Sequence, residues 1–332
     1  MPPPGHNSLP SPLSPQPRAH GTASDHCNRR TLLSGAAALF VKMGAGSALA
    51  QPPLKESPPA PQAPDAASPR TKELVARMST ETPPPIEVAH SISYRLSTRA
   101  DADQRRLDVY RNMSSGKNPV VIFVHGGAWR SGHRRQYVPL GVCLALNRIT
   151  AVIPNYSQAP GYRFPEPERD IAAVVNWVHD NMSRFGGDPE KIFLAGHSTG
   201  AQIAALVALD ARYLGFHSLP LTVIRGVISI SGIYEVPAGF EYAFDGEADR
   251  AKASPMRFVR DGAPPFLIVR GGHDAQLVQR QSEPFAERLR KHGVKVETEV
   301  YPEEDHSSII ALASIRESPL LERMTRFVKD HS

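Results

Sequence analysis

Residues 191–204 read Lys-Ile-Phe-Leu-Ala-Gly-His-Ser-Thr-Gly-Ala-Gln-Ile-Ala, and this stretch decides the expected fold. The run 191–195 has the composition of a buried strand, and the Ala-rich run 199–210 predicts a helix. Between them lies Gly-x-Ser-x-Gly, centred on Ser198. A strand, a sharp turn and a helix around such a serine form a nucleophile elbow, in which flanking glycines remove clashing side chains. A plain strand-to-helix turn is the alternative interpretation.

Strand and helix patterns alternate outward from this stretch. The pattern predicts further helices over 170–184, 283–292 and 317–329, and strands over 88–96, 107–110, 119–124, 149–154, 223–230, 265–269 and 294–301. Such alternation predicts an α/β fold with a mostly parallel central sheet. The first two strands alternate apolar and polar residues, which favours an antiparallel N-terminal edge.

A glycine-rich loop follows the apolar run 119–124 and reads His125-Gly126-Gly127-Ala128-Trp129. Acyl transfer through a tetrahedral intermediate needs N–H donors aimed at the developing oxyanion. We therefore expect an oxyanion hole in which Gly126 shapes the turn and three backbone N–H groups donate, those of Gly127, Ala128 and Thr199. The aromatic residues Trp129, Tyr156 and Tyr162 are candidates for lining a substrate pocket or for packing.

An acid and a base follow two later strands. Asp274 comes after the strand 265–269, and His306 comes after the strand 294–301. In this architecture the order along the chain is serine, acid, histidine, each at the end of a strand. Ser198 would then attack a carbonyl carbon, His306 would take and return the proton, and Asp274 would orient the imidazole.

Two neighbours compete for these roles. Asp305 adjoins His306, although adjacent side chains on an extended segment point in opposite directions. His273 adjoins Asp274 and is the alternative base, whereas His197 is expected to pack near the elbow. No histidine or cysteine pair has metal-ligand spacing, so we expect neither a metal nor another cofactor. The histidines that would have to converge are His125, His133, His197, His273 and His306.

The N-terminal part has a different composition. Seventeen of the 32 prolines lie in residues 1–85. Residues 1–50 contain the pair Arg29-Arg30, then an Ala/Gly/Leu stretch, then the small-x-small site Ala48-Leu49-Ala50. This layout predicts a signal peptide of the twin-arginine type, used by the machinery that exports folded proteins, and hence a periplasmic or secreted protein. A disordered basic arm before a short core helix is the alternative.

Residues 51–85 are rich in proline and alanine and predict a disordered linker, with a short helical turn favoured over 72–78. The catalytic domain is then expected over 86–332. The two cysteines exclude a disulfide scaffold, and Cys143 sits in an apolar run that predicts a buried structural thiol.

The net charge of +5 excludes few partners by itself. Residues 1–50 contribute +3 of it, and the remainder has no dense basic block, so a nucleic-acid partner is not expected. No uncharged apolar run has the roughly 20 residues of a membrane-spanning helix. The sequence does not indicate an oligomeric state.

These motifs resemble the α/β-hydrolase superfamily, and within it the carboxylesterase branch with a His-Gly-Gly-x-Trp loop. That branch includes bacterial kynurenine formamidases, prenylcysteine methylesterase-like enzymes and acetylxylan/feruloyl esterases. The resemblance runs from about Arg106 to the C-terminus. It rests on the stretches 121–132, 164–177, 185–201, 253–255 and 272–278, and on His306.

The resemblance implies an α/β-hydrolase fold with helices on both faces of the sheet. It also implies a serine hydrolase of small or aromatic carboxylic esters, acting through Ser198, His306 and Asp274. Only about 35 residues separate the strand ending at Ile230 from the next, which leaves room for a small cap. An arylformamidase that cleaves an amide, and a non-catalytic binding protein with this fold, are the alternatives.

Overall fold

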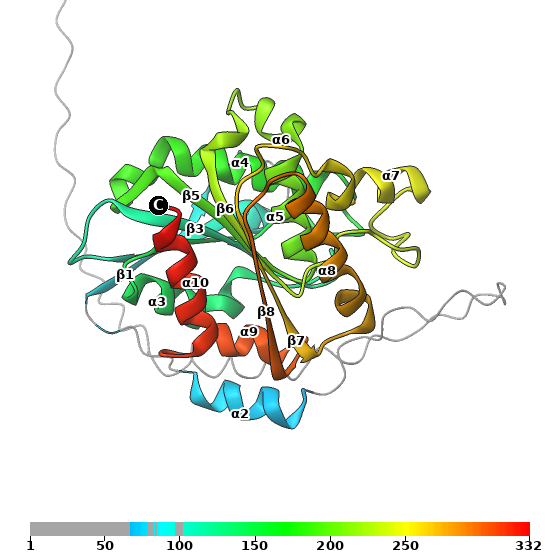
Figure 1. The fold of residues 1–332 in the computed structure, drawn as a ribbon. Helices are drawn as coiled ribbons and strands as arrows, with labels where there is room; N and C mark the ends of the chain where they lie inside the picture. Colours follow the sequence, from blue (N-terminus) through cyan, green and yellow to red (C-terminus); the bar gives the residue numbers. More distant parts are fainter. Residues whose placement is uncertain (1–66, 79–82, 84, 97–101) are drawn as a thin grey trace, which may run out of the picture.

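The computed structural model describes residues 67–78, 83, 85–96 and 102–332, so the predicted signal peptide and most of the predicted linker lie outside it. In the described part, eight strands form one sheet in the order β1-β2-β4-β3-β5-β6-β7-β8 (Figure 1). Their bounds are Ile86–Ser93 (β1), Arg106–Asn112 (β2), Asn118–Val124 (β3), Thr150–Pro154 (β4), Gly187–His197 (β5), Ile224–Ile230 (β6), Phe266–His273 (β7) and Val296–Asp305 (β8).

The sheet is mostly parallel with an antiparallel edge, as the sequence predicted. β1 pairs antiparallel with β2, and β2 antiparallel with β4. The pairs from β4 through β3, β5, β6 and β7 to β8 are all parallel. The carboxyl ends of β5, β7 and β8 therefore lie at one edge of the sheet, where the predicted serine, acid and histidine follow.

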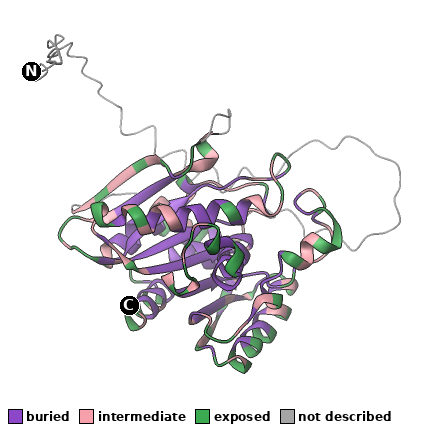
Figure 2. Ribbon diagram, turned by 90° about the horizontal axis from the view of Figure 1, so that it is seen from above, coloured by how far each residue is buried: buried purple, intermediate pink, exposed green. Residues whose placement is uncertain are grey.

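Helices cover both faces of this sheet. Their bounds are Pro69–Arg77 (α2), Val138–Leu146 (α3), Glu166–Asn181 (α4), Thr199–Leu209 (α5), Ala211–Gly215 (α6), Gly246–Lys252 (α7), Gln276–Lys291 (α8), Ser308–Ala313 (α9) and Pro319–Asp330 (α10). Alternate residues of β3 enter two separate apolar cores. Val120, Ile122 and Val124 pack with α4, α5 and α8, whereas Val121 and Phe123 pack with α3, α9 and α10. The buried sheet between the two helical layers is visible in Figure 2.

Several helices differ from the sequence prediction. The helix predicted over 283–292 begins at Gln276 and runs through Pro284, because a proline within a packed helix costs less than exposing the apolar face that continues before it. Helix α3 was not predicted, because it is buried almost all round and so shows no apolar stripe. Its Cys143 is a free, buried thiol, as expected.

Part of the predicted linker is folded. Residues 69–77 form helix α2, which lies beside α9 (Figure 1). Ser68 caps this helix by accepting a bond from the Thr71 N–H, and Pro69 occupies the first turn. Leu74 is fully buried in the core that contains α9. The linker prediction is therefore wrong for these residues, although the helical turn favoured over 72–78 falls within or next to α2.

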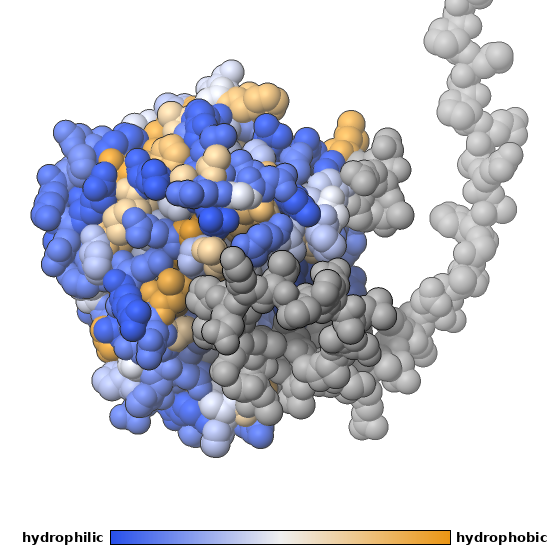
Figure 3. Space-filling model, turned by 90° about the vertical axis from the view of Figure 1, so that its right-hand side faces the viewer, coloured by the Kyte–Doolittle hydropathy of each residue, from blue (hydrophilic) through white to orange (hydrophobic). Residues whose placement is uncertain are grey.

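The face shown in Figure 3 has hydrophobic residues scattered among hydrophilic ones. The exposed large hydrophobic side chains are isolated from one another in sequence: Leu96, Met113, Phe216 and Val300. Among the described helices, none has the length and apolar character needed to cross a bilayer.

Candidate active site

Ser198 lies in a strained turn between β5 and α5. Its φ of 55° and ψ of −122° are unfavourable for a residue with a side chain, and such strain is typical of functional sites. Two close backbone approaches require the flanking glycines. A Cβ at position 196 would lie 2.4 Å from the carbonyl oxygen of Gly200, and one at position 200 would lie 2.1 Å from the carbonyl oxygen of Val124. The local sequence therefore builds the nucleophile elbow that it predicted.

Ser198, His306 and Asp274 form a continuous hydrogen-bonded chain. The Nε2 of His306 lies 2.9 Å from the Oγ of Ser198, and its Nδ1 lies 2.7 Å from Oδ1 of Asp274. This geometry matches a tautomer in which Nδ1–H donates to the carboxylate and Nε2 accepts from the serine hydroxyl. Ser198 and the His306 ring are partly exposed, so a substrate can reach them.

Asp274 is buried and surrounded by donors. Its carboxylate accepts from the Ser231 hydroxyl, from the Ala275 N–H at 2.8 Å and from the Gly271 N–H at 3.3 Å. Burial disfavours the charged form, but the hydrogen bond and charge of His306, then the Ser231 bond, hold the pKa of Asp274 below its ordinary value. The acid therefore stays ionised beside the imidazole. Sequence reasoning missed Ser231, which directly follows β6 and has no motif of its own.

His197 supports His306 through a hydrogen bond to its backbone, and it packs near the elbow as expected. Its Nε2 donates to the backbone carbonyl of His306 at 2.8 Å, and the two ring centroids are 4.8 Å apart. Burial, and then the neighbouring charge of His306, lowers the pKa of His197 to about 3. The His197 ring is therefore a neutral donor at physiological pH.

The structure separates both competing residues from these roles. Oδ1 of Asp305 accepts from the backbone N–H groups of Ser307 and Ser308, which fixes the start of α9. His273 is exposed and its neighbour Asp274 bonds to His306 instead. Within the described residues, no three metal-ligating side chains converge.

The predicted oxyanion loop packs against the elbow. A Cβ at position 126 would lie 3.1 Å from the Cβ of Ser198, so Gly126 lets the loop approach the nucleophile. Gly127, with φ of 130°, also accepts from the Ser131 N–H at 3.0 Å, and this closes the turn. In the part of the chain that the structure describes, no hydrogen bond engages the N–H of Gly127, Ala128 or Thr199. These three donors are the ones proposed from the sequence.

The aromatic candidates for substrate contact are packing residues. Trp129 is 1% exposed, and its indole meets Phe240 and Phe244 edge-on, with both ring centroids 4.9 Å away. Tyr156 is fully buried, and its hydroxyl donates to the carbonyl of His125, on whose ring it stacks. Both side chains therefore fit the packing alternative in this structure, because each satisfies its polar atom inside the protein.

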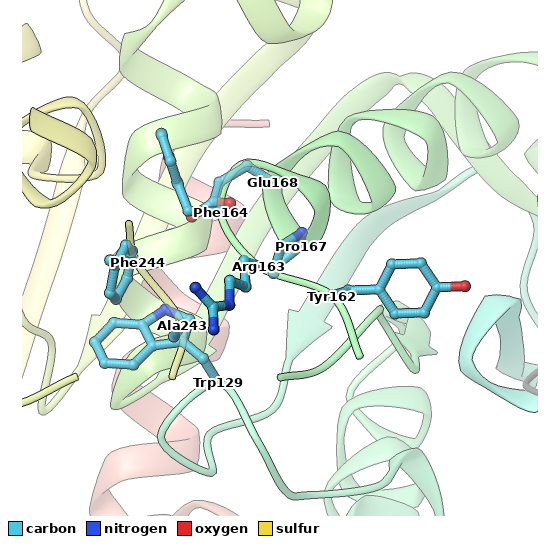
Figure 4. A pocket seen from close by; sticks show the side chains of 8 residues that line it. All are labelled: Trp129, Tyr162, Arg163, Phe164, Pro167, Glu168, Ala243 and Phe244. Carbon is cyan, nitrogen blue, oxygen red and sulfur yellow. The ribbon is translucent and has the colours of Figure 1, made fainter. Parts of the chain in front are cut away.

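Tyr162 belongs to a narrow crevice beside Trp129 but its ring points away from the indole (Figure 4). The guanidinium of Arg105 lies over that ring, 5.6 Å from its centroid. Tyr162 therefore does not face the oxyanion loop. The crevice is lined by Trp129, Tyr162, Arg163, Phe164, Pro167, Glu168, Ala243 and Phe244.

A buried polar cluster, which no sequence motif indicates, supports the predicted oxyanion loop. Gln202 of α5 accepts from the Trp129 indole N–H at 2.9 Å and donates to the carbonyl of Ala253 at 2.7 Å. The same amide donates to Oε1 of Glu168 at 3.3 Å. Burial raises the pKa of Glu168 to about 7, so this carboxyl is largely neutral below that pH. Gln202 thus links the loop, the nucleophile helix and the segment before β7.

Together, the sheet order, the elbow and the strand-end acid and histidine define the α/β-hydrolase fold. A family model described as "alpha/beta hydrolase fold" matches residues 121–242, which include the oxyanion loop and Ser198. The chain is thus an α/β hydrolase in fold, as its motifs predicted.

Curated relatives extend this similarity beyond the matched segment. The chain is 28% identical over 262 residues to an isoprenylcysteine alpha-carbonyl methylesterase of Arabidopsis thaliana, covering 70% of this chain and 61% of that protein. It is 30% identical over 246 residues to the esterase LipQ of Mycobacterium tuberculosis, covering 67% of this chain and 58% of that protein. The chain therefore spans about 60% of the length of these relatives.

Solved structures agree on the fold. Esterase B of Lactobacillus rhamnosis superposes with a TM-score of 0.65 at 20% identity, covering 79% of this chain and 90% of that one. An esterase of Pyrobaculum calidifontis gives a TM-score of 0.63 at 20% identity with the same coverage of both chains. At this identity the likeness establishes the architecture.

Proposed function

We propose that this protein hydrolyses carboxylic esters by forming an acyl-enzyme on Ser198. The observation that carries the proposal is the continuous chain of hydrogen bonds from Ser198 through His306 to Asp274, at 2.9 and 2.7 Å. The names of the relatives, an isoprenylcysteine methylesterase and an esterase, support the same reaction class.

The proposed reaction has two halves. Nε2 of His306 takes the proton of Ser198 as its Oγ attacks the ester carbonyl, and the resulting oxyanion accepts from the N–H groups of Gly127, Ala128 and Thr199. His306 then gives the proton to the departing alkoxide, which leaves as the alcohol. A water attacks the acyl-enzyme with His306 as base, and collapse releases the carboxylic acid and regenerates Ser198.

Small or aromatic esters fit this site best. The segment 231–265 contains one short α-helix, α7, and its Phe240 and Phe244 pack against Trp129 beside the oxyanion loop. A cavity of about 720 Å³ lies instead along α4 and α6, and its lining includes neither Ser198 nor His306. These features favour a compact acyl group over a long chain.

A series of 4-nitrophenyl esters from acetate to octanoate tests the proposal on the full chain. We expect the highest kcat/KM on the shortest esters, and loss of activity in Ser198→Ala. Ser183→Ala, at an exposed serine outside the site, is the matched control and should keep full activity. N-formylkynurenine is assayed in parallel, and hydrolysis of that formamide alone would move the protein to the arylformamidase alternative. Inactivity of folded protein on every substrate would contradict the proposal and favour a binding protein.

We also propose that residues 1–50 direct export through the twin-arginine machinery. Arg29-Arg30 and the site Ala48-Leu49-Ala50 support it, although they lie outside the described residues. A double substitution of the arginine pair by lysine should retain the protein in the cytoplasm of a bacterial host. Periplasmic protein that begins at Gln51 is expected for the natural sequence, and equal export of both forms would contradict the proposal.

A further inference from the structure

Helix α2 lies outside the predicted catalytic domain, yet it contacts the end of β8, which leads directly into His306. Residues 304–308 are called the histidine loop below. Arg70 donates to Oε1 of Glu304 from Nε at 3.1 Å and from Nη2 at 2.8 Å. The Thr71 hydroxyl donates to Oδ1 of Asp305 at 3.5 Å. Leu74 anchors the helix in the apolar core beside α9. These contacts join residues separated by 234 positions in the chain.

The carboxylate of Glu304 is buried, which is unusual for a charged group. It is 2% exposed, and Arg70 is its only ion-pair partner within the described residues. Its second oxygen, Oε2, has no hydrogen-bond partner there. The Arg70 side chain is partly exposed and also pairs with Glu73, but its removal would leave the buried Glu304 carboxylate without a counter-charge, so the position of Glu304 depends on Arg70.

The backbone of Glu304 in turn contacts Gly271, a residue that hydrogen-bonds to Asp274. A Cβ at position 271 would lie 2.2 Å from the carbonyl oxygen of Glu304, so the two backbone segments are in direct contact there. Gly271 is also the residue whose N–H donates to Asp274. A shift at Glu304 would therefore disturb both His306, two residues further on, and the carboxylate that orients it.

Contacts from two separate segments thus hold the histidine loop. His197 bonds the backbone carbonyl of His306 from the elbow side. Arg70 and Thr71 bond the two residues that precede His306 from the α2 side. Asp305 also accepts from the N–H groups of Ser307 and Ser308, so the α2 contact reaches the turn on which His306 sits.

We propose that α2 is a positioning element for His306 and that the Arg70–Glu304 pair is its principal contact. This inference rests on the proposed function only in so far as His306 is taken as the base. The segment that the composition marks as a linker is therefore, in its folded part, a component of the active-site support. Its loss should affect the chemical step more than substrate binding, because α2 touches the histidine loop and not the oxyanion loop.

Arg70→Gln in the full chain tests this inference against Arg77→Gln. Arg77 lies on the same helix and only reaches the exposed Glu73, at 3.9 Å. With 4-nitrophenyl acetate we expect Arg70→Gln to lower kcat about 10-fold and to leave KM nearly unchanged, because misplacing a catalytic group by a fraction of an ångström has effects of this order. Arg77→Gln should match the wild type, and Arg70→Lys, which keeps the charge, should recover most of the loss.

A substrate-free readout separates this inference from the proposed function. The Nδ1 proton of His306, shared with Asp274, should give a far-downfield proton NMR signal that is absent in His306→Ala. We expect Arg70→Gln to broaden or shift that signal and Arg77→Gln to leave it unchanged. An inactive wild type would contradict the ester hydrolase alone, because the NMR comparison still tests the role of α2.

Glu304→Gln provides a second variant if Arg70→Gln is poorly folded, as judged by urea unfolding. It should give the same loss of kcat and the same spectral change, and the double variant should be no worse than either single one, since both remove one interaction. Wild-type kcat and an unchanged His306 signal in folded Arg70→Gln or Glu304→Gln would overturn the inference.

Discussion

The two halves of the active site are built by different means. The nucleophile half consists of Ser198 and the loop 125–129. Its shape comes from the backbone, through positive φ angles and through glycines that lie close to other backbone segments of the same chain. The acid–histidine half, Asp274 and His306, is held by side chains that come from distant parts of the sequence, namely Ser231, His197 and Arg70.

This contrast determines how each half should respond to mutation. The backbone at the elbow has no room for a further side-chain atom, because a single added carbon would overlap a neighbouring backbone segment. Side-chain support at the histidine is distributed over several contacts, and each can be weakened alone. We therefore expect all-or-none effects from substitutions that disturb the elbow backbone and graded effects from substitutions of supporting side chains.

The largest effect is expected at the nucleophile itself. Ser198→Ala should lower kcat/KM for ester hydrolysis by roughly 10⁴-fold or more, as loss of a triad nucleophile does elsewhere. Steady-state assays beside Ser183→Ala measure it. Residual activity within tenfold of the wild type would show that another group does the chemistry.

Gly200→Ala tests the rigidity of the elbow. The new Cβ would lie 2.1 Å from the Val124 carbonyl oxygen, so either the elbow or β3 must move. We expect a loss of about 3 kcal/mol in the free energy of unfolding, typical of overpacking, together with loss of activity. Gly215→Ala is the matched control, because a Cβ there meets nothing within 4 Å. Urea unfolding compares the two, and equal stability of both variants would refute a rigid elbow.

Gln202→Leu sharpens the comparison from within the nucleophile half, where one side-chain cluster supports the backbone. The substitution removes the bonds to Trp129, Ala253 and Glu168. We expect a stability loss of about 2 kcal/mol from the unpaired buried groups and a fall in kcat of about 10-fold through the oxyanion loop. Trp129→Phe, which loses the indole bond but keeps an aromatic ring, should lower kcat in the same direction. An unchanged kcat in both variants would show that the cluster does not position the loop.

The smallest expected net effect concerns acid stability, because two buried groups act in opposite directions. Burial lowers the pKa of His125 to about 4, against 6.5 for an exposed histidine, so the unfolded state binds more protons between these values. Stability therefore falls as the pH drops from 7 to 5, by about 2 kcal/mol for this one group. Glu168 acts with the opposite sign, because its raised pKa near 7 favours the folded state as the pH falls.

Urea unfolding at pH 7 and pH 5 separates these two contributions. His125→Phe should lose less stability than the wild type on acidification, and Glu168→Gln should lose more. The same pH dependence in all three proteins would contradict the burial of these groups in their neutral forms.

The local geometry around Ser198 could be predicted from the sequence, for a physical reason. Two local patterns surround Ser198. One is a glycine where two backbone segments approach closely, and the other is the apolar run of a buried strand. The sheet, its antiparallel edge and the positions of Asp274 and His306 follow from the same local signals, because strand ends can be counted along the chain.

The supports of the other half could not be predicted. Ser231 and Arg70 carry no motif, and they reach the site only through the tertiary fold. Helix α2 is short and lies among prolines, so its composition indicates a linker, whereas the structure places Leu74 in the core. The choice between lining and packing for Trp129 could not be made from the sequence, because its neighbours Phe240 and Phe244 come from the segment after β6, beyond any local pattern.

Trapping of the acyl-enzyme would show whether Ser198 is the nucleophile that His306 and Asp274 activate. The full chain is quenched during turnover of a 4-nitrophenyl ester, digested and mapped by mass spectrometry. We expect an acyl group on Ser198 that is absent in Ser198→Ala and greatly reduced in His306→Ala. Active enzyme that carries its acyl group on another residue, or none under conditions that trap acyl-enzymes, would contradict it.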